Sequence, residues 1–122
     1  MVHLIHYELK GHRSRFEYER LAEAIKNISG VYCHTPESTW LVETELTTRQ
    51  VVDRIAPLTV VGDPLLVFRL HNDWSSYSFT QEQINWLRGR NFTSLAEAVM
   101  SVLPLGRGLA STLTSPNSLG GR

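Results

Sequence analysis

Residues 37–44 read ESTWLVET, and this stretch decides how the chain folds. Its β-branched and aromatic side chains favour an extended strand over residues 39–44. Pro36 and Glu37 give a turn signal ahead of that strand, and the short apolar run VYCH occupies residues 31–34. Two strands this close in sequence pair most readily as an antiparallel hairpin. The stretch is therefore predicted to be the second strand of a hairpin.

Helical patterns flank the hairpin on both sides. Ser14 and Glu17 have the spacing of a capping box, in which each side chain bonds the backbone N–H of the other, and Gly30 can end the helix that they begin. Thr47 or Thr48 can cap a second helix. The predicted elements are strands over residues 2–9, 31–34, 39–44 and 65–70 and helices over residues 14–28 and 49–58.

The order of these elements is strand, helix, strand, strand, helix, strand. This order predicts an α+β, ferredoxin-like fold of the split βαββαβ type, with a four-stranded antiparallel sheet and two helices on one face. The opposite face of the sheet is left bare, and large exposed apolar surfaces are uncommon on monomers. We therefore expect a second copy of the chain, or the chain's own C-terminal segment, to cover that face.

The sequence beyond the fourth predicted strand indicates where the folded domain ends and a C-terminal extension begins. Thr80 and Gln83 repeat the capping pattern at the start of a further helix, so we expect the ferredoxin-like domain to span residues 1–89. The run SLAEAVMSVL predicts a C-terminal helix within residues 90–103. Residues 104–122 hold no acidic side chain and many small ones, which is typical of a flexible tail.

Composition narrows the functional classes. Twelve basic and twelve acidic residues give a net charge of zero, so bulk charge offers no argument for a nucleic acid or an anionic lipid as partner. No window approaches the roughly 18 apolar residues of a membrane span. The single cysteine, Cys33, cannot form an internal disulfide and lies in an apolar, strand-like run. We expect a cytoplasmic protein without membrane contact, and an inert thiol.

His6 and Glu8 are the first candidates for chemistry. Alternation along the first strand puts Leu4, His6 and Glu8 on one face. If two bare sheet faces associate about a two-fold axis, Glu8 can meet its symmetry mate near the strand end. Two carboxylates so close require a divalent cation or a proton between them, which is one route to a metal site. The alternative is that Glu8 is a solvated acid and His6 a surface or interface histidine.

A basic loop follows the first strand. Lys10, His12, Arg13 and Arg15 lead into the N-terminus of the first predicted helix, where backbone N–H groups favour anions. These residues are the candidates for phosphate contact, with an ordinary solvated loop as the alternative.

Other patterns exclude some enzyme classes. The five histidines are scattered singly, without the partners of a zinc site, and the serines near the C-terminus lack the setting of a hydrolase nucleophile. There is no glycine-rich phosphate loop. Trp40 and Trp86 are predicted to be core anchors, and Trp74 is open to either a core or a base-stacking role.

Several segments carry a family resemblance. In order, LIHYEL, YERLAEAIKNI, ESTWLVET, TTRQVVDRI, DPLLVFRL and DW resemble the SinR-like group of small proteins similar to the second CRISPR-associated adaptation protein, and more distantly the VapD toxins. The resemblance covers about residues 2–88. It implies a ferredoxin-like fold, a homodimer and, for some relatives, metal-dependent cleavage of RNA or DNA. Those relatives carry an aspartate after the tyrosine that ends the first strand, where this chain has Glu8 after Tyr7.

The first functional hypothesis is a homodimeric Mg²⁺-dependent endonuclease acting on RNA or DNA, as a toxin or defence component. Glu8 of each copy would hold the metal, and His6 or His12 would orient water or donate a proton. Arg13 and Arg15, with Lys10 in the same loop, would contact phosphates.

The alternative hypothesis is a non-catalytic dimeric scaffold of the same fold, in which the region from Phe92 onward recruits a partner. It rests on the zero net charge, the glutamate in place of the aspartate and the pliable tail. A regulator that binds small ligands in a cleft of the sheet is a third option.

Overall fold

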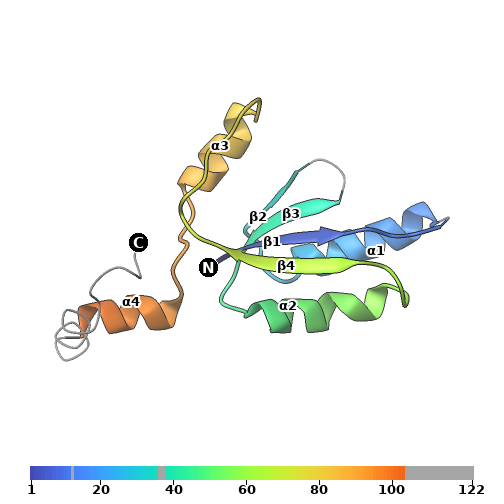
Figure 1. Ribbon diagram of the computed structural model, residues 1–122, viewed down its shortest axis with the longest axis horizontal. Coiled ribbons are helices and arrows are strands. Elements are labelled where there is room, and N and C mark those ends of the chain that lie inside the picture. The colour runs from blue at the N-terminus through green and yellow to red at the C-terminus, as the bar shows by residue number, and fades with distance from the viewer. Residues whose placement is uncertain (12, 36–37, 104–122) are drawn as a thin grey trace. The chain divides into compact units, whose positions relative to one another are not determined.

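The computed structural model in Figure 1 describes residues 1–11, 13–35 and 38–103. These residues belong to two compact units, the first spanning Met1–Phe92 and the second beginning at Thr93. The first unit runs past the predicted boundary at residue 89 because Phe92 is buried in it. The predicted tail, residues 104–122, lies outside the described residues.

The first unit is built on one antiparallel sheet. Its strand order is β2-β3-β1-β4, so β1 is hydrogen-bonded to a neighbour on each side. Ile5 of β1 lies opposite Trp40 on one side and Val67 on the other. The predicted hairpin is present, with Cys33 opposite Leu41, and the predicted α+β class is confirmed. The strands are β1 (Val2–Tyr7), β2 (Tyr32–His34), β3 (Thr39–Glu43) and β4 (Leu65–Leu70).

Four α-helices and one 3-10 turn complete the described chain. They are α1 (Arg15–Lys26), α2 (Thr48–Ile55), η1 (Ala56–Leu58), α3 (Gln81–Arg88) and α4 (Leu95–Val102). Each α-helix begins with a complete capping box, as at Ser14 and Glu17. The first helix ends at Lys26, with Asn27 as its C-cap, before the predicted end near Gly30, and the next N–H, of Ile28, reaches back only three residues to the Ile25 carbonyl. Pro57 falls in η1, which tightens the end of the second helix.

Helices α1 and α2 cover one face of the sheet (Figure 1). Trp40, only 1% exposed, is the largest fully buried side chain there. Its ring stacks on His34 with centroids 4.0 Å apart, and its indole N–H donates to the Tyr7 hydroxyl at 3.3 Å. The core prediction for Trp40 is confirmed. The buried cluster contains Ile5, Tyr7, Leu9, Leu21, Ile25, Trp40, Val42, Val51 and Ile55.

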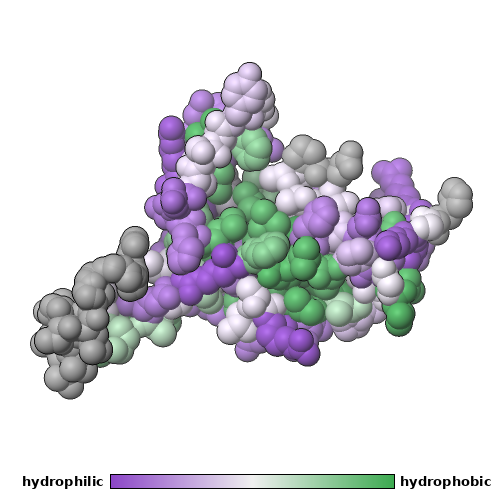
Figure 2. Space-filling view, in the orientation of Figure 1, coloured by the Kyte–Doolittle hydropathy of each residue, from purple (hydrophilic) through white to green (hydrophobic). Residues whose placement is uncertain are grey.

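The other face is covered at one end only. Leu87 from α3 and Phe92 pack with Val2 and Leu41 there, and Trp86 lies half-buried against them. The outward-facing side chains further along β4 are open, with Leu66 53% and Phe68 54% exposed. Figure 2 shows the resulting hydrophobic surface over the sheet. The outward face of β4 is thus covered over part of its length, because Leu70 packs with Leu87 and Phe92 at one end while β4, an edge strand, leaves Leu66 and Phe68 open.

His3 lies fully buried on the helix-covered side. Its Nε2 atom is 2.6 Å from the Leu46 carbonyl oxygen, which makes Nε2–H the donor of that bond. Its Nδ1 atom is buried without a hydrogen-bond partner among the described residues. Burial, helped by the positive N-terminus and Arg69, lowers the pKa of His3 below its ordinary value of 6.5. The folded state therefore keeps this ring neutral at a pH where the unfolded chain binds a proton.

We expect the free energy of unfolding to decrease as the pH falls below 6.5, because the unfolded chain then binds a proton that the folded chain excludes. The variant His3→Gln keeps a donor for Leu46 but cannot titrate, so its stability should vary less between pH 7 and pH 5. Urea unfolding of both proteins across that range measures the difference. The exposed His71→Gln is the control, and a curve for His3→Gln parallel to that of the parent would contradict the prediction.

Candidate functional site

The two candidates on the first strand lie on the open side of the sheet. His6 is exposed, and its Nδ1 atom lies 3.2 Å from the Thr39 hydroxyl. Glu8 is exposed one residue after β1, where its backbone N–H donates to the Pro64 carbonyl at 3.0 Å. That bond extends the β1–β4 pairing by one residue, so the backbone at Glu8 is still extended. Alternation along the strand then places the Glu8 side chain on the same open sheet face as His6.

One chain supplies few metal ligands at this place. Among the described residues there is no group of three or more histidine, cysteine, aspartate or glutamate side chains that could hold an ion. Mg²⁺ is commonly held by one or two carboxylates while retaining several waters. Glu8 with His6 therefore fits a magnesium ion only where a second carboxylate, such as that of another copy, is added.

The predicted phosphate loop is organised by an internal ion pair. The Arg13 Nη2 atom lies 3.0 and 2.9 Å from the two carboxylate oxygens of Asp63, and Arg13 Nε–H donates to the Lys10 carbonyl at 3.0 Å. Both side chains are nearly buried, at 11% and 2% exposure. We call this pair the Arg13–Asp63 clamp. It joins the loop after β1 to the turn before β4, so the Arg13 guanidinium is already engaged.

The other residues of the predicted loop are arranged differently. The Arg15 side chain is 91% exposed and pairs with Glu19 at 2.9 Å, one helical turn away. Lys10 is exposed, although its backbone N–H donates to Asp63 at 3.1 Å. His12 lies outside the described residues. The structure thus leaves Lys10 and Arg15 on the surface and draws Arg13 inward.

The clamp changes the acidity of its carboxylate. Burial alone would raise the pKa of Asp63, but hydrogen bonds from the backbone N–H groups of Lys10 and Val60, together with the Arg13 charge, lower it below its ordinary value of 3.8. A carboxylate with a lowered pKa stabilises the fold above that ordinary value, and the contribution is lost as the pH falls through the lowered pKa. The clamp is therefore a source of stability at neutral pH.

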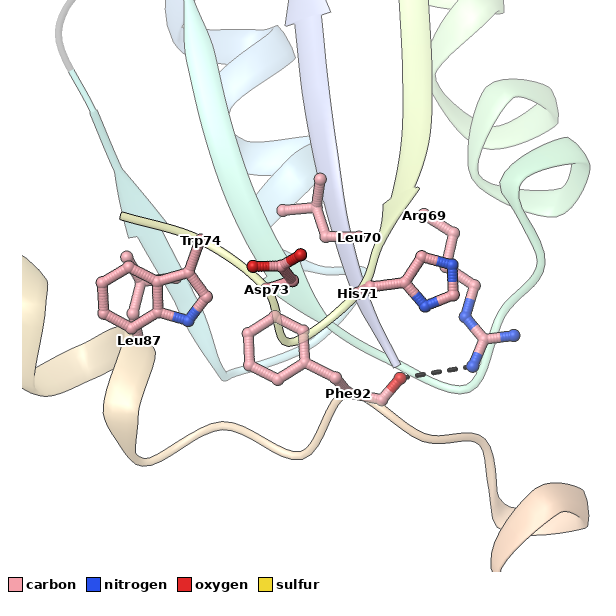
Figure 3. Close-up of a pocket in the computed structure, with 7 residues that line it drawn as sticks. All are labelled: Arg69, Leu70, His71, Asp73, Trp74, Leu87 and Phe92. Carbon is pink, nitrogen blue, oxygen red and sulfur yellow. Dashed lines mark hydrogen bonds between the residues drawn. The ribbon is translucent and has the colours of Figure 1, made fainter. Parts of the chain in front are cut away.

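The sequence did not reveal a pocket at the other end of the sheet. It has a volume of about 360 Å³, and Figure 3 shows its seven lining side chains. We call it the Trp74 pocket. The sequence left the role of Trp74 open and gave no reason to group these seven residues. Its lining residues are Arg69, Leu70, His71, Asp73, Trp74, Leu87 and Phe92.

Cys33 behaves as a packing residue. It is half-buried against the cluster that holds Leu87 and Phe92. Burial, with a smaller effect from the Glu82 charge, raises the pKa of the Cys33 thiol. A raised pKa reduces the thiolate fraction at neutral pH, so the thiol is a weak nucleophile.

Comparison with known proteins adds no identification. No protein family, curated protein or solved structure matches the chain. The resemblance to the SinR-like group stays a hypothesis for that reason. Within the described ranges, no helix has the length and apolar character needed to cross a membrane.

Replacing Arg13 should cost far more stability than replacing Arg15. Arg13→Gln leaves the nearly buried Asp63 carboxylate without its cation, whereas Arg15→Gln removes only a solvated pair. We also expect the acid-induced loss of stability to begin at higher pH in Arg13→Gln, because the pKa of Asp63 rises. Denaturant unfolding at neutral and acid pH tests both points. Equal losses in the two variants would show that the clamp is unimportant.

Proposed function

We propose that this protein is a non-catalytic interaction module that assembles as a homodimer through its open sheet face. The observation that carries the proposal is the exposure of Leu66 and Phe68 beside the half-buried Leu4. We call these three residues the sheet-face patch; they lie together because Phe68 pairs with Leu4 across the strands, and Leu66 with His6. Adjoining apolar side chains left open on a monomer commonly mark an interaction surface.

The charges around the patch favour a second copy as the occupant. The charged side chain that faces outward from the four strands is Glu43, at the far end of β3. Glu43 is already held by Arg90 at 3.5 Å and by the backbone N–H of Asn91 at 3.0 Å. Glu8, exposed one residue beyond β1, is a second outward carboxylate on this face. Two copies of the uncharged patch can therefore face each other without burying an unpaired charge where Glu8 stays at the solvated edge of the contact.

The arrangement of polar groups favours a scaffold over an enzyme. Glu8 is the carboxylate beside His6, and the described residues add no third metal ligand to them. The Arg13 guanidinium is committed to Asp63. Neither feature points to chemistry at these residues, whereas adjoining exposed apolar side chains are typical of an interaction surface.

Phe68→Glu should convert the dimer into a monomer. It puts a carboxylate at the centre of the patch, where association would bury it without a partner, while the side chain is exposed enough in one copy to leave the fold intact. Phe16→Glu is the matched control, since Phe16 is 65% exposed on α1, on the covered side of the sheet. Sedimentation velocity at micromolar concentrations gives the mass of each variant.

Two outcomes would contradict the proposal. One is a parent protein that stays monomeric up to the highest soluble concentration. The other is a dimer that Phe68→Glu leaves unchanged, which would place the contact elsewhere.

A metal-dependent nuclease is the second candidate. Its support is the position of His6 and Glu8 on the same open side as the sheet-face patch. A two-fold axis through the patch would bring two copies of this pair toward each other, so that each copy contributes one carboxylate. The ion held there would supply Lewis-acid activation of a phosphodiester. Lys10 and Arg15, which are exposed, would be the cations available to the nucleic acid backbone.

On this second candidate, Glu8→Gln should reduce Mg²⁺-dependent cleavage of RNA or DNA by at least about 100-fold, because the metal loses its carboxylate ligand. Glu23→Gln, which changes an exposed acid on α1, should cleave like the parent. Sedimentation must show the same mass for all three proteins. Equal cleavage by Glu8→Gln and the parent would exclude this site, and a parent inactive on both substrates would exclude the nuclease.

A further inference from the structure

The Trp74 pocket is held in shape by contacts within the first unit. Leu87 and Phe92 form its buried wall, and both belong to the cluster that covers Val2 and Leu41. The Arg69 Nη2 atom donates to the Phe92 carbonyl at 3.2 Å, the bond drawn in Figure 3. The end of β4 is thereby tied to the segment after α3. The pocket therefore exists before any ligand arrives.

The charges that line the pocket favour a cation. Asp73 is exposed, and its carboxylate has no hydrogen bond or ion pair among the described residues. The guanidinium of Arg69 is engaged with the Phe92 carbonyl. The carboxylate of Asp73 is thus available to a ligand, whereas the Arg69 guanidinium, which keeps its charge, lies on the far side of His71 from Trp74 in Figure 3.

The aromatic lining favours the same kind of ligand. The Trp74 indole N–H donates to the Asn72 side-chain oxygen at 3.1 Å, which fixes the ring while leaving it half-buried at the pocket. In Figure 3 the Asp73 carboxylate lies between Trp74 and His71, on the side of the Phe92 ring. Aromatic faces attract cations, and a nearby carboxylate adds direct charge attraction.

We propose that the Trp74 pocket binds the arginine or lysine side chain of a partner polypeptide, with Asp73 pairing with its charge and Trp74 and Phe92 packing against its aliphatic stem. A volume of about 360 Å³ is near the lower end of small-ligand pockets and suits a side chain better than a large cofactor. The neutral backbone of a peptide brings no further charge to the pocket, whereas a free amino acid brings an α-ammonium and an α-carboxylate that each need a partner. This observation favours a peptide over the free amino acid.

The experiment uses the full chain and a blocked tripeptide, acetyl-Gly-Arg-Gly-amide, as probe. We expect a saturable shift of the Trp74 indole N–H resonance in NMR titrations. The same peptide with norleucine in place of arginine should bind at least about tenfold more weakly, because it keeps the stem and loses the charge. Asp73→Asn should show a similar loss, while Asp53→Asn, which changes an exposed aspartate on α2, should bind like the parent.

Several outcomes would overturn the proposal. Equal affinity of the protein for the arginine and norleucine peptides would show that the charge of the ligand does not contribute to binding. Equal affinity of the parent and Asp73→Asn for the arginine peptide would show the same for the Asp73 carboxylate. Tighter binding of free arginine than of the blocked peptide would make the ligand a small molecule instead. Absence of any Trp74 shift would remove the site. The proposal is independent of dimer formation, so the monomeric Phe68→Glu variant should bind the arginine peptide with the affinity of the parent.

Discussion

The hydrogen bonding of β1 on both edges is the constraint on which the rest of the first unit depends. This strand joins β3 on one side and β4 on the other, so strands distant in sequence meet only through it. Successive side chains of β1 point to opposite faces of the sheet. Ile5 and Tyr7 therefore lie in the helix-covered core, while Leu4 and His6 lie on the open face. The buried core, the sheet-face patch and the position of Glu8 all follow from that one strand.

Local signals in the sequence predicted much of this fold. The capping pairs, the β2–β3 hairpin and the burial of Trp40 depend on neighbours in the chain or on strong apolar character, and all were found. The Arg13–Asp63 clamp joins residues 50 positions apart, and no local pattern marks such a pair. Its effect was to move Arg13 from the predicted phosphate contacts into the framework of the loop.

The partial cover on the second sheet face explains both proposed binding surfaces. Leu87 and Phe92 pack over one end of that face and stop short of Leu66 and Phe68. Where the cover ends over β4, Leu70 and Phe92 share in lining the Trp74 pocket. The sequence could not predict this pocket because its walls come from a strand end, a loop, a helix and the segment after it. These pieces meet only once the sheet has formed.

The capping boxes have a consequence for how the chain tolerates change. In each α-helix of the described residues, two backbone N–H groups of the first turn are bonded by side chains of that same turn, as by Ser94 and Glu97 in α4. The starting residue of each helix is therefore encoded where it stands and does not depend on the length of the preceding connection. Insertions or deletions in the loops can alter the spacing of the elements during evolution without shifting which side chains each helix turns inward.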